Sequence, residues 1–144
     1  MPGFVLKLDV GIYLEYSPAR RYAPDYDYSE AYVGASWRNL AARAHFSPDY
    51  YSSDRSTLYL ELEAAFEPAP NWQLGAHVGS LTYLEAPPPY LPRREYDWRV
   101  GAARQVAGFS LFAEVSGRLE GRAYAIRGTN YEKTAVVFGV SRAF

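Results

Sequence analysis

The sequence predicts an all-β fold: an up-and-down antiparallel transmembrane β-barrel of about eight strands, with short periplasmic turns and longer extracellular loops. Three observations predict it. Apolar and polar residues alternate with period two in eight segments. Aromatic residues are abundant, with 14 Tyr, 7 Phe and 3 Trp. Short and long connections alternate along the chain. We expect a single domain over residues 1–144, because no linker or change of composition divides them.

Composition excludes several classes of protein. The chain has 15 Lys and Arg against 16 Asp and Glu, so it lacks the basic excess of a nucleic-acid-binding protein. It has no Cys, so neither a disulfide framework nor a thiolate metal site is expected. No run of about 18 apolar residues predicts a transmembrane helix. The first four residues do not begin a signal peptide, so we expect that a signal has been removed or that the chain is truncated.

The clearest alternation is in residues 4–16. Every even position there, from Phe4 to Tyr16, is apolar, whereas Lys7, Asp9 and Glu15 stand at odd positions. A helix would spread the apolar residues around its circumference, but a strand turns them all to one face. This segment is therefore predicted to be a strand.

The same alternation predicts seven further strands. They lie at residues 28–37, 40–46, 58–66, 72–84, 96–104, 109–117 and from 136 to the end. Most of these segments have about the length at which a tilted strand crosses a bilayer.

The connections between the segments differ in length in a regular way. Short turns are predicted at 38–39, 67–71 and 105–108, and longer polar loops at 17–27, 47–57, 85–95 and 118–132. Bacterial outer-membrane barrels have tight periplasmic turns and longer extracellular loops. We therefore expect both chain ends on the periplasmic side.

The two faces of the strands differ in composition. The polar face holds Gly, Ser, Ala and Tyr with a few charges, which suits the interior of a narrow barrel better than a water-exposed surface. The apolar face is then predicted to contact lipid. Alternation alone leaves an alternative open: a soluble, lipocalin-like barrel that turns its apolar face inward around a ligand.

Bulky aromatic residues stand near the strand ends on the apolar face, as in the aromatic belts of membrane barrels. The predicted membrane-interface aromatics are Trp37, Phe46, Phe66, Trp72, Trp98, Phe109 and Phe144. A terminal aromatic after an alternating strand is the signal read by the barrel-assembly machinery, so Phe144 predicts that partner. The other expected partner is the lipid bilayer. The expected location is the outer membrane of a Gram-negative bacterium, and the sequence does not predict an oligomeric state.

The chain resembles the TorF family of porin-type outer-membrane proteins, in particular the last eight strands of that family. The matching motifs are Leu8-Asp9-Val10-Gly11, Tyr28-Ser29-Glu30-Ala31-Tyr32-Val33-Gly34, Leu58-Tyr59-Leu60-Glu61, Trp72-Gln73-Leu74-Gly75-Ala76-His77-Val78-Gly79, Tyr96-Asp97-Trp98-Arg99-Val100-Gly101 and the final eight residues from Val137. They occur in the same order over most of the chain. The resemblance implies an outer-membrane location and passive passage of small solutes or ions.

Charged and histidine side chains on the inward face form a predicted polar network in the lumen. Its members are Glu30, Arg43, His45, Glu61, Glu63, His77, Asp97, Arg99 and Glu114. Cross-strand pairing is expected to place Arg43 opposite Glu61, Glu61 opposite His77, and Arg99 opposite Glu114. We interpret the network as a plug, since side chains fill an eight-stranded barrel and charges within it must pair. The alternative is a charged constriction that selects small ions.

Two further interpretations are weaker. His45, Glu61 and His77 could ligate a metal, but ion-paired histidines are commoner. His45 and Ser47, with a nearby carboxylate, form the one triad-like grouping of a lipid-modifying enzyme, and both are expected to point away from lipid. The sequence therefore predicts no catalytic residue, no metal and no cofactor.

Overall fold

The structure is a computed structural model that describes residues 6–15, 28–50, 55–87, 89, 92–120 and 134–142. The described residues form eight strands: β1 (Leu6–Glu15), β2 (Tyr28–Trp37), β3 (Leu40–Ser47), β4 (Thr57–Phe66), β5 (Trp72–Tyr83), β6 (Arg94–Val106), β7 (Phe109–Glu120) and β8 (Thr134–Arg142). In this part of the chain no helix is long and apolar enough to cross a membrane.

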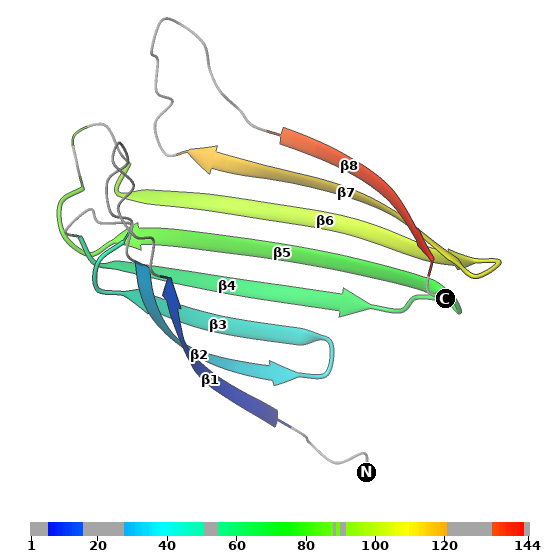
Figure 1. The fold of residues 1–144 in the computed structure, drawn as a ribbon, viewed down its shortest axis with the longest axis horizontal. Coiled ribbons are helices and arrows are strands. Elements are labelled where there is room, and N and C mark those ends of the chain that lie inside the picture. Colours follow the sequence, from blue (N-terminus) through cyan, green and yellow to red (C-terminus); the bar gives the residue numbers. More distant parts are fainter. Residues whose placement is uncertain are drawn as a thin grey trace, which may run out of the picture.

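All eight strands belong to one antiparallel sheet, in the order β1-β2-β3-β4-β5-β6-β7-β8 (Figure 1). The predicted all-β, up-and-down topology is confirmed. The strand at 28–37 has the predicted bounds, whereas β6 and β7 are longer than expected. Two of the four extra residues of β6, Gln105 and Val106, adjoin the β6–β7 turn, which is two residues long where four were predicted.

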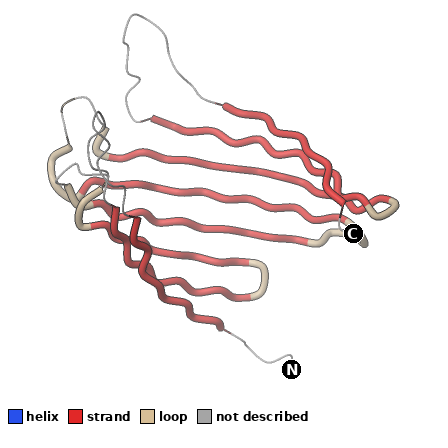
Figure 2. Tube along the Cα trace, viewed as in Figure 1, coloured by secondary structure: helices blue, strands red, loops and turns tan. Residues whose placement is uncertain are grey.

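The sheet is open rather than closed. β1 pairs with β2 and β8 pairs with β7, but among the described residues β1 and β8 do not pair with each other. The two strands form opposite edges of a curved sheet (Figures 1 and 2). The fold thus has the strand number and order of the expected barrel without its closure.

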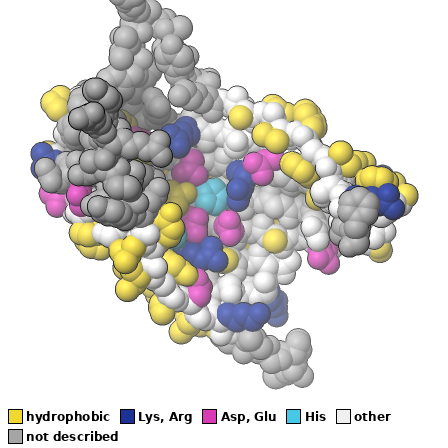
Figure 3. All heavy atoms as spheres, in the orientation of Figure 1, with side chains coloured by type: hydrophobic (Ala, Val, Ile, Leu, Met, Phe, Trp, Pro, Cys, Tyr) yellow, Lys and Arg dark blue, Asp and Glu magenta, His cyan; other side chains and the backbone are white. Residues whose placement is uncertain are grey.

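The polar face lies on the inside of the curve. On that face, side chains from strands two apart touch: Asp9 of β1 meets Arg43 of β3 at 3.2 Å, and Tyr59 of β4 meets Asp97 of β6 at 3.2 Å. Figure 3 shows the charged and histidine side chains gathered at the centre of this concave face.

The convex face carries the apolar residues of the alternation. Val10, Ile12 and Phe138 are 76%, 77% and 76% exposed. Few described residues are buried, because no second layer of structure formed by the described residues covers the sheet. The buried ones include Tyr83, Ser47 and Thr57.

Tight hairpins join the strands at one end of the sheet. Residues 38–39 and 107–108 are two-residue turns, and Ala107 and Gly108 both have positive φ, at 50° and 82°. These are the left-handed conformations that match the twist of paired strands. Of the predicted long loops, 17–27 and most of 118–132 lie outside the described residues.

Candidate functional site

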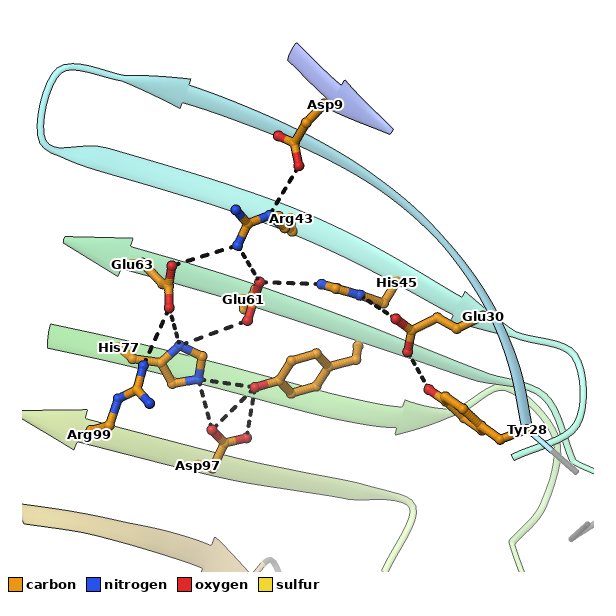
Figure 4. A network of polar contacts seen from close by, with 11 residues as sticks. Asp9, Tyr28, Glu30, Arg43, His45, Glu61, Glu63, His77, Asp97 and Arg99 are labelled. Carbon is orange, nitrogen blue, oxygen red and sulfur yellow. Dashed lines mark hydrogen bonds and ion pairs between the residues drawn. The ribbon is translucent and has the colours of Figure 1, made fainter. Parts of the chain in front are cut away.

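All nine residues of the predicted polar network belong to strands β2 to β7 and contact one another on the concave face. Figure 4 shows the cluster at their centre. Three further residues, Asp9, Tyr28 and Tyr59, make hydrogen bonds or ion pairs with members of the network and were not predicted to belong to it. The odd position of Asp9 in residues 4–16 placed it on the polar face and was the available signal.

Arg43 joins three strands. Its Nε donates to Asp9 Oδ2 at 3.2 Å, and its Nη1 donates to Glu61 Oε1 at 3.2 Å and lies 3.6 Å from Glu63 Oε2. Gly34 stands between β1 and β3, where a Cβ would lie 2.5 Å from Asp9 Oδ1 and 2.8 Å from Arg43 Cγ. A glycine is needed there because the ion pair passes directly over its backbone.

His45 lies between two carboxylates. Its Nδ1 is 2.7 Å from Glu30 Oε1, and its Nε2 is 3.3 Å from Glu61 Oε1. The Tyr28 hydroxyl donates to the other oxygen of Glu30. Both ring nitrogens of His45 are thus engaged by glutamates rather than by Ser47, so the structure does not assemble the triad-like grouping.

His77 is the most enclosed of the charged and histidine residues at the centre of the network, with 11% of its side chain exposed, against 14% for Glu61. Its Nε2 is 2.9 Å from Asp97 Oδ1, and the Tyr59 hydroxyl donates to the same carboxylate at 3.2 Å. Its Nδ1 lies 3.9 Å from Glu61 Oε2 and 3.7 Å from Glu63 Oε1. That nitrogen is buried and makes no hydrogen bond.

Arg99 connects the network to β7. Its Nη2 donates to Glu63 Oε1 at 3.4 Å, and its Nε lies 3.7 Å from Glu114 Oε2. Both contacts are half-exposed, so each adds little to stability by itself.

The strand register confirms one predicted pairing and corrects two. Arg43 is opposite Glu61, as expected. His77 is opposite Glu63 rather than Glu61, and Arg99 is opposite Ser116 rather than Glu114. In both errors the predicted register differs from the observed one by two residues, because the turn between the paired strands begins or ends at a different residue than expected. A shift of two keeps each side chain on its face, so all these residues still meet.

Two hollows of the concave face lie on either side of the network. One, of about 950 Å³, is at the hairpin end and is lined by Arg38, Ala41, Glu63 and Phe112 among others. The second, of about 770 Å³, is at the loop end and is lined by Tyr28, His45, Tyr59 and Asp97 among others. Arg99 and Glu114 line both. The network therefore separates two water-accessible spaces.

The six described aromatic residues among those predicted at the membrane interface lie on the convex face. Trp37, Phe46, Phe66, Trp72 and Phe109 are exposed, and Trp98 packs over Gly117; Phe144 lies outside the described residues. Three arginines stack on aromatic rings at the hairpin end: Arg38 on Trp37 at 4.8 Å, Arg104 on Trp72 at 5.1 Å and Arg142 on Phe109 at 5.1 Å.

Comparison with known proteins gives a family without an assigned activity. No curated protein and no solved structure matches the chain. The model of one protein family, Gcw_chp, described as a bacterial protein of unknown function, matches residues 2–144. With this match covering nearly its whole length, the chain belongs to the Gcw_chp family.

Proposed function

We propose that this chain forms a β-barrel in the bacterial outer membrane, with its convex face against lipid and its polar network filling the lumen. One observation carries the proposal: a sheet whose convex face is aliphatic and exposed, and whose concave face holds an ion-paired network. Lipid-facing and lumen-facing residues of membrane barrels alternate in this way.

The extent of the exposed apolar surface supports lipid as its partner. Exposed aliphatic residues occur on every strand, including Leu8, Val33, Leu60, Val78 and Val140. A continuous apolar surface across a whole sheet far exceeds the patches that soluble monomers expose. In a bilayer the same surface is fully solvated by acyl chains.

The rim of the sheet supports a membrane boundary at the hairpin end. Trp and Phe rings prefer the headgroup region, and arginines beside them can extend toward phosphates. The stacked pairs Arg38–Trp37, Arg104–Trp72 and Arg142–Phe109 lie at that one height. Arg142, the one charge on the apolar face of β8, is therefore suited to an interface.

A sheet in lipid cannot leave its edges unpaired, because each free backbone group costs several kcal/mol in hydrocarbon. The first residue of β1, Leu6, and the last residue of β8, Arg142, both lie at the hairpin end of the sheet. The two strands therefore run in opposite directions and could pair as antiparallel neighbours. We propose that β1 and β8 pair in the membrane and close an eight-stranded barrel.

The proposed transport role is limited by the network. An eight-stranded barrel leaves a lumen about as wide as its own side chains. The Arg43, His45, His77 and Arg99 contacts bridge β1 to β7 between the two hollows. Passage is then restricted to water and small ions, a narrow version of the porin-type role that the TorF resemblance implies.

The curvature of the sheet argues against a soluble ligand-binding barrel. A lipocalin-like barrel needs its apolar face on the inside of the curve, to enclose a ligand. Here ion pairs that span strands two apart, Asp9 with Arg43 and Glu63 with Arg99, occupy the inside. A soluble barrel built from this sheet would enclose charges and expose its leucines.

Dependence on detergent tests the proposal. We expect the purified chain to stay monodisperse and β-structured only with detergent or lipid, and to aggregate when the detergent is removed. The measurement is size-exclusion chromatography with light scattering, alongside circular dichroism. A folded, monodisperse sample at high concentration without detergent would contradict a lipid-facing exterior.

A further inference from the structure

We propose that Glu61, Glu63 and His77 bind one divalent cation of the Zn²⁺ type, with Asp97 orienting the histidine. The site needs only the pairing of β4 with β5 and of β5 with β6, which is present in the open sheet, so it does not depend on barrel closure. It also differs from the weaker interpretation of the sequence, in which His45 was a ligand: both nitrogens of His45 are engaged by Glu30 and Glu61.

The donor atoms already form a compact set. One ligand atom each from Glu61, Glu63 and His77 lies within 4.8 Å of the others. The imidazole Nδ1 is 3.9 Å from Glu61 Oε2 and 3.7 Å from Glu63 Oε1. Ligand atoms around a tetrahedral Zn²⁺ are about 3.4 Å apart, given metal–ligand distances of about 2.1 Å. The two distances from His77 would therefore shorten by about 0.3–0.5 Å, and the separation of the two carboxylate oxygens by at most about 1.4 Å, to form a tetrahedral site.

The tautomer of His77 directs a nitrogen lone pair toward Glu61 and Glu63. Asp97 as a carboxylate only accepts hydrogen bonds, so the 2.9 Å contact requires a proton on His77 Nε2. In the neutral imidazole, Nδ1 then carries the lone pair. That atom is buried, makes no hydrogen bond and faces two carboxylate oxygens. A lone pair and two carboxylate oxygens that face one another in this way are suited to a shared cation.

The arrangement of Asp97 is that of an outer-shell ligand. Metal-bound histidines commonly donate their second N–H to a carboxylate, which fixes the ring and raises its basicity. Asp97 is itself held by the Tyr59 hydroxyl at 3.2 Å. The chain from Tyr59 through Asp97 to His77 thus holds the ring from the side away from the two glutamates.

Charge balance also favours a cation. The ion-paired network contains six carboxylates, from Asp9, Glu30, Glu61, Glu63, Asp97 and Glu114, against two guanidiniums, from Arg43 and Arg99. The carboxylates and guanidiniums together therefore carry a charge of −4. Arg43 donates to Glu61 Oε1, which leaves Oε2 directed at His77. A bound divalent cation would halve the excess negative charge.

One imidazole nitrogen and two carboxylate oxygens suit Zn²⁺, with water as a further ligand. Water can reach the site, since His77 lines the hollow at the loop end and Glu63 lines the one at the hairpin end. The site therefore lies between the two hollows of the concave face.

The test is calorimetric titration of Zn²⁺ into the untagged chain, folded in detergent micelles and freed of metal by a chelator. We expect one saturable site per chain. Glu61→Gln and Glu63→Gln should each weaken binding by more than the roughly 10–100-fold expected for Asp97→Asn, which removes an outer-shell partner. Glu114→Gln is the matched control: it removes the same charge from the same face and should leave the affinity within about twofold of the unsubstituted chain, because it touches Arg99 and not the site.

Co²⁺ provides a second measurement that does not rely on heat. Its visible absorption should report one nitrogen and oxygen ligands in the unsubstituted chain and in Glu114→Gln, and should be lost in Glu63→Gln. Tryptophan emission checks that each variant is folded. No saturable Zn²⁺ uptake, or equal uptake by the unsubstituted chain, Glu61→Gln and Glu63→Gln, would overturn the proposal and leave the cluster as ion pairs and protonated histidine.

Discussion

At the residue scale, glycines on the concave face make room for the network. The Tyr59 ring and the Asp97 carboxylate meet above Gly79, where a Cβ would lie 2.1 Å from Tyr59 Oη and 2.6 Å from Asp97 Oδ2. The role of these glycines as space for large neighbours could be predicted from the period-two pattern. Which neighbour fills each space depends on register, which the pattern does not give.

Gly79→Ala should therefore disturb the Tyr59–Asp97–His77 contacts. We expect a loss of about 1–3 kcal/mol in the free energy of unfolding, the usual cost of overpacking. Gly75→Ala is the control on the same strand and face, because its Cβ would meet nothing closer than Ala64 O at 4.0 Å. The measurement is urea unfolding in micelles, and equal costs for the two variants would refute the close packing over Gly79.

Glu85 predicts a local pH dependence outside the strands. Its carboxylate accepts from Ser56 Oγ at 2.7 Å and from Ser56 N at 2.8 Å, and these hydrogen bonds lower the pKa of Glu85. Because its pKa is lower in the folded state, the contact is at full strength above the ordinary glutamate pKa. It is lost as the pH falls through the lowered value. Amide exchange at Ser56, corrected for intrinsic rates, should accelerate over that acidic range. Ser56→Ala removes the hydroxyl donor but keeps the backbone N–H, so it should reduce the acceleration at the neighbouring Leu84 amide, which donates to the carbonyl oxygen of residue 56. A Leu84 exchange profile unchanged by Ser56→Ala would rule out this coupling.

At the element scale, strand identity was predictable and strand ends were less so. The alternation in β1 and β2 is uninterrupted, so these strands match the prediction closely. Around 105–108 the sequence suggested a four-residue turn, but Gln105 and Val106 continue β6, and Ala107 takes a positive φ of 50° that side chains rarely adopt. No local pattern distinguishes Ala107 from a strand residue, so the register error at Glu114 could not have been avoided.

The same scale gives a prediction about the convex face. Leu60→Arg would place a charge near the middle of the proposed bilayer span and should cost about 2–4 kcal/mol in lipid vesicles. Ser116→Arg, on the concave face near mid-strand, should cost much less, because Glu114 and water are close by. Refolding titrations in vesicles compare the two, and a larger cost for Ser116→Arg would mean that lipid contacts the other face.

At the scale of the whole molecule, the network predicts a poorly conducting barrel. Arg43→Ala would leave Asp9 and Glu61 without their shared guanidinium and should cost about 2 kcal/mol, since Arg43 is about one-third exposed. Arg38→Ala, at the exposed hairpin, should cost far less. In planar bilayers the unsubstituted chain should conduct weakly and Arg43→Ala more strongly. Large, stable channels from the unsubstituted chain would exclude a plug and would instead require a wider, multi-chain pore.

The overall topology could be predicted because eight alternating segments joined by short and long connections allow few arrangements. Closure could not be predicted from the pattern, since an open curved sheet and a closed barrel have the same alternation. The metal site proposed at His77 could likewise not be predicted from the alternation of apolar and polar residues. Its third ligand is Glu63, which depends on the β4–β5 register.

The most direct test of the central claim is a spin-label scan of β7 in lipid vesicles. The chain has no cysteine, so single cysteines at residues 111–116 can each carry a nitroxide without further changes. We expect the accessibility of the label to alternate from one residue to the next. Labels at 111, 113 and 115 should be accessible to oxygen, which dissolves in lipid, and labels at 112, 114 and 116 to a water-soluble nickel complex. Accessibility to nickel at all six positions, or the opposite alternation, would contradict a membrane-embedded sheet with its apolar face toward lipid.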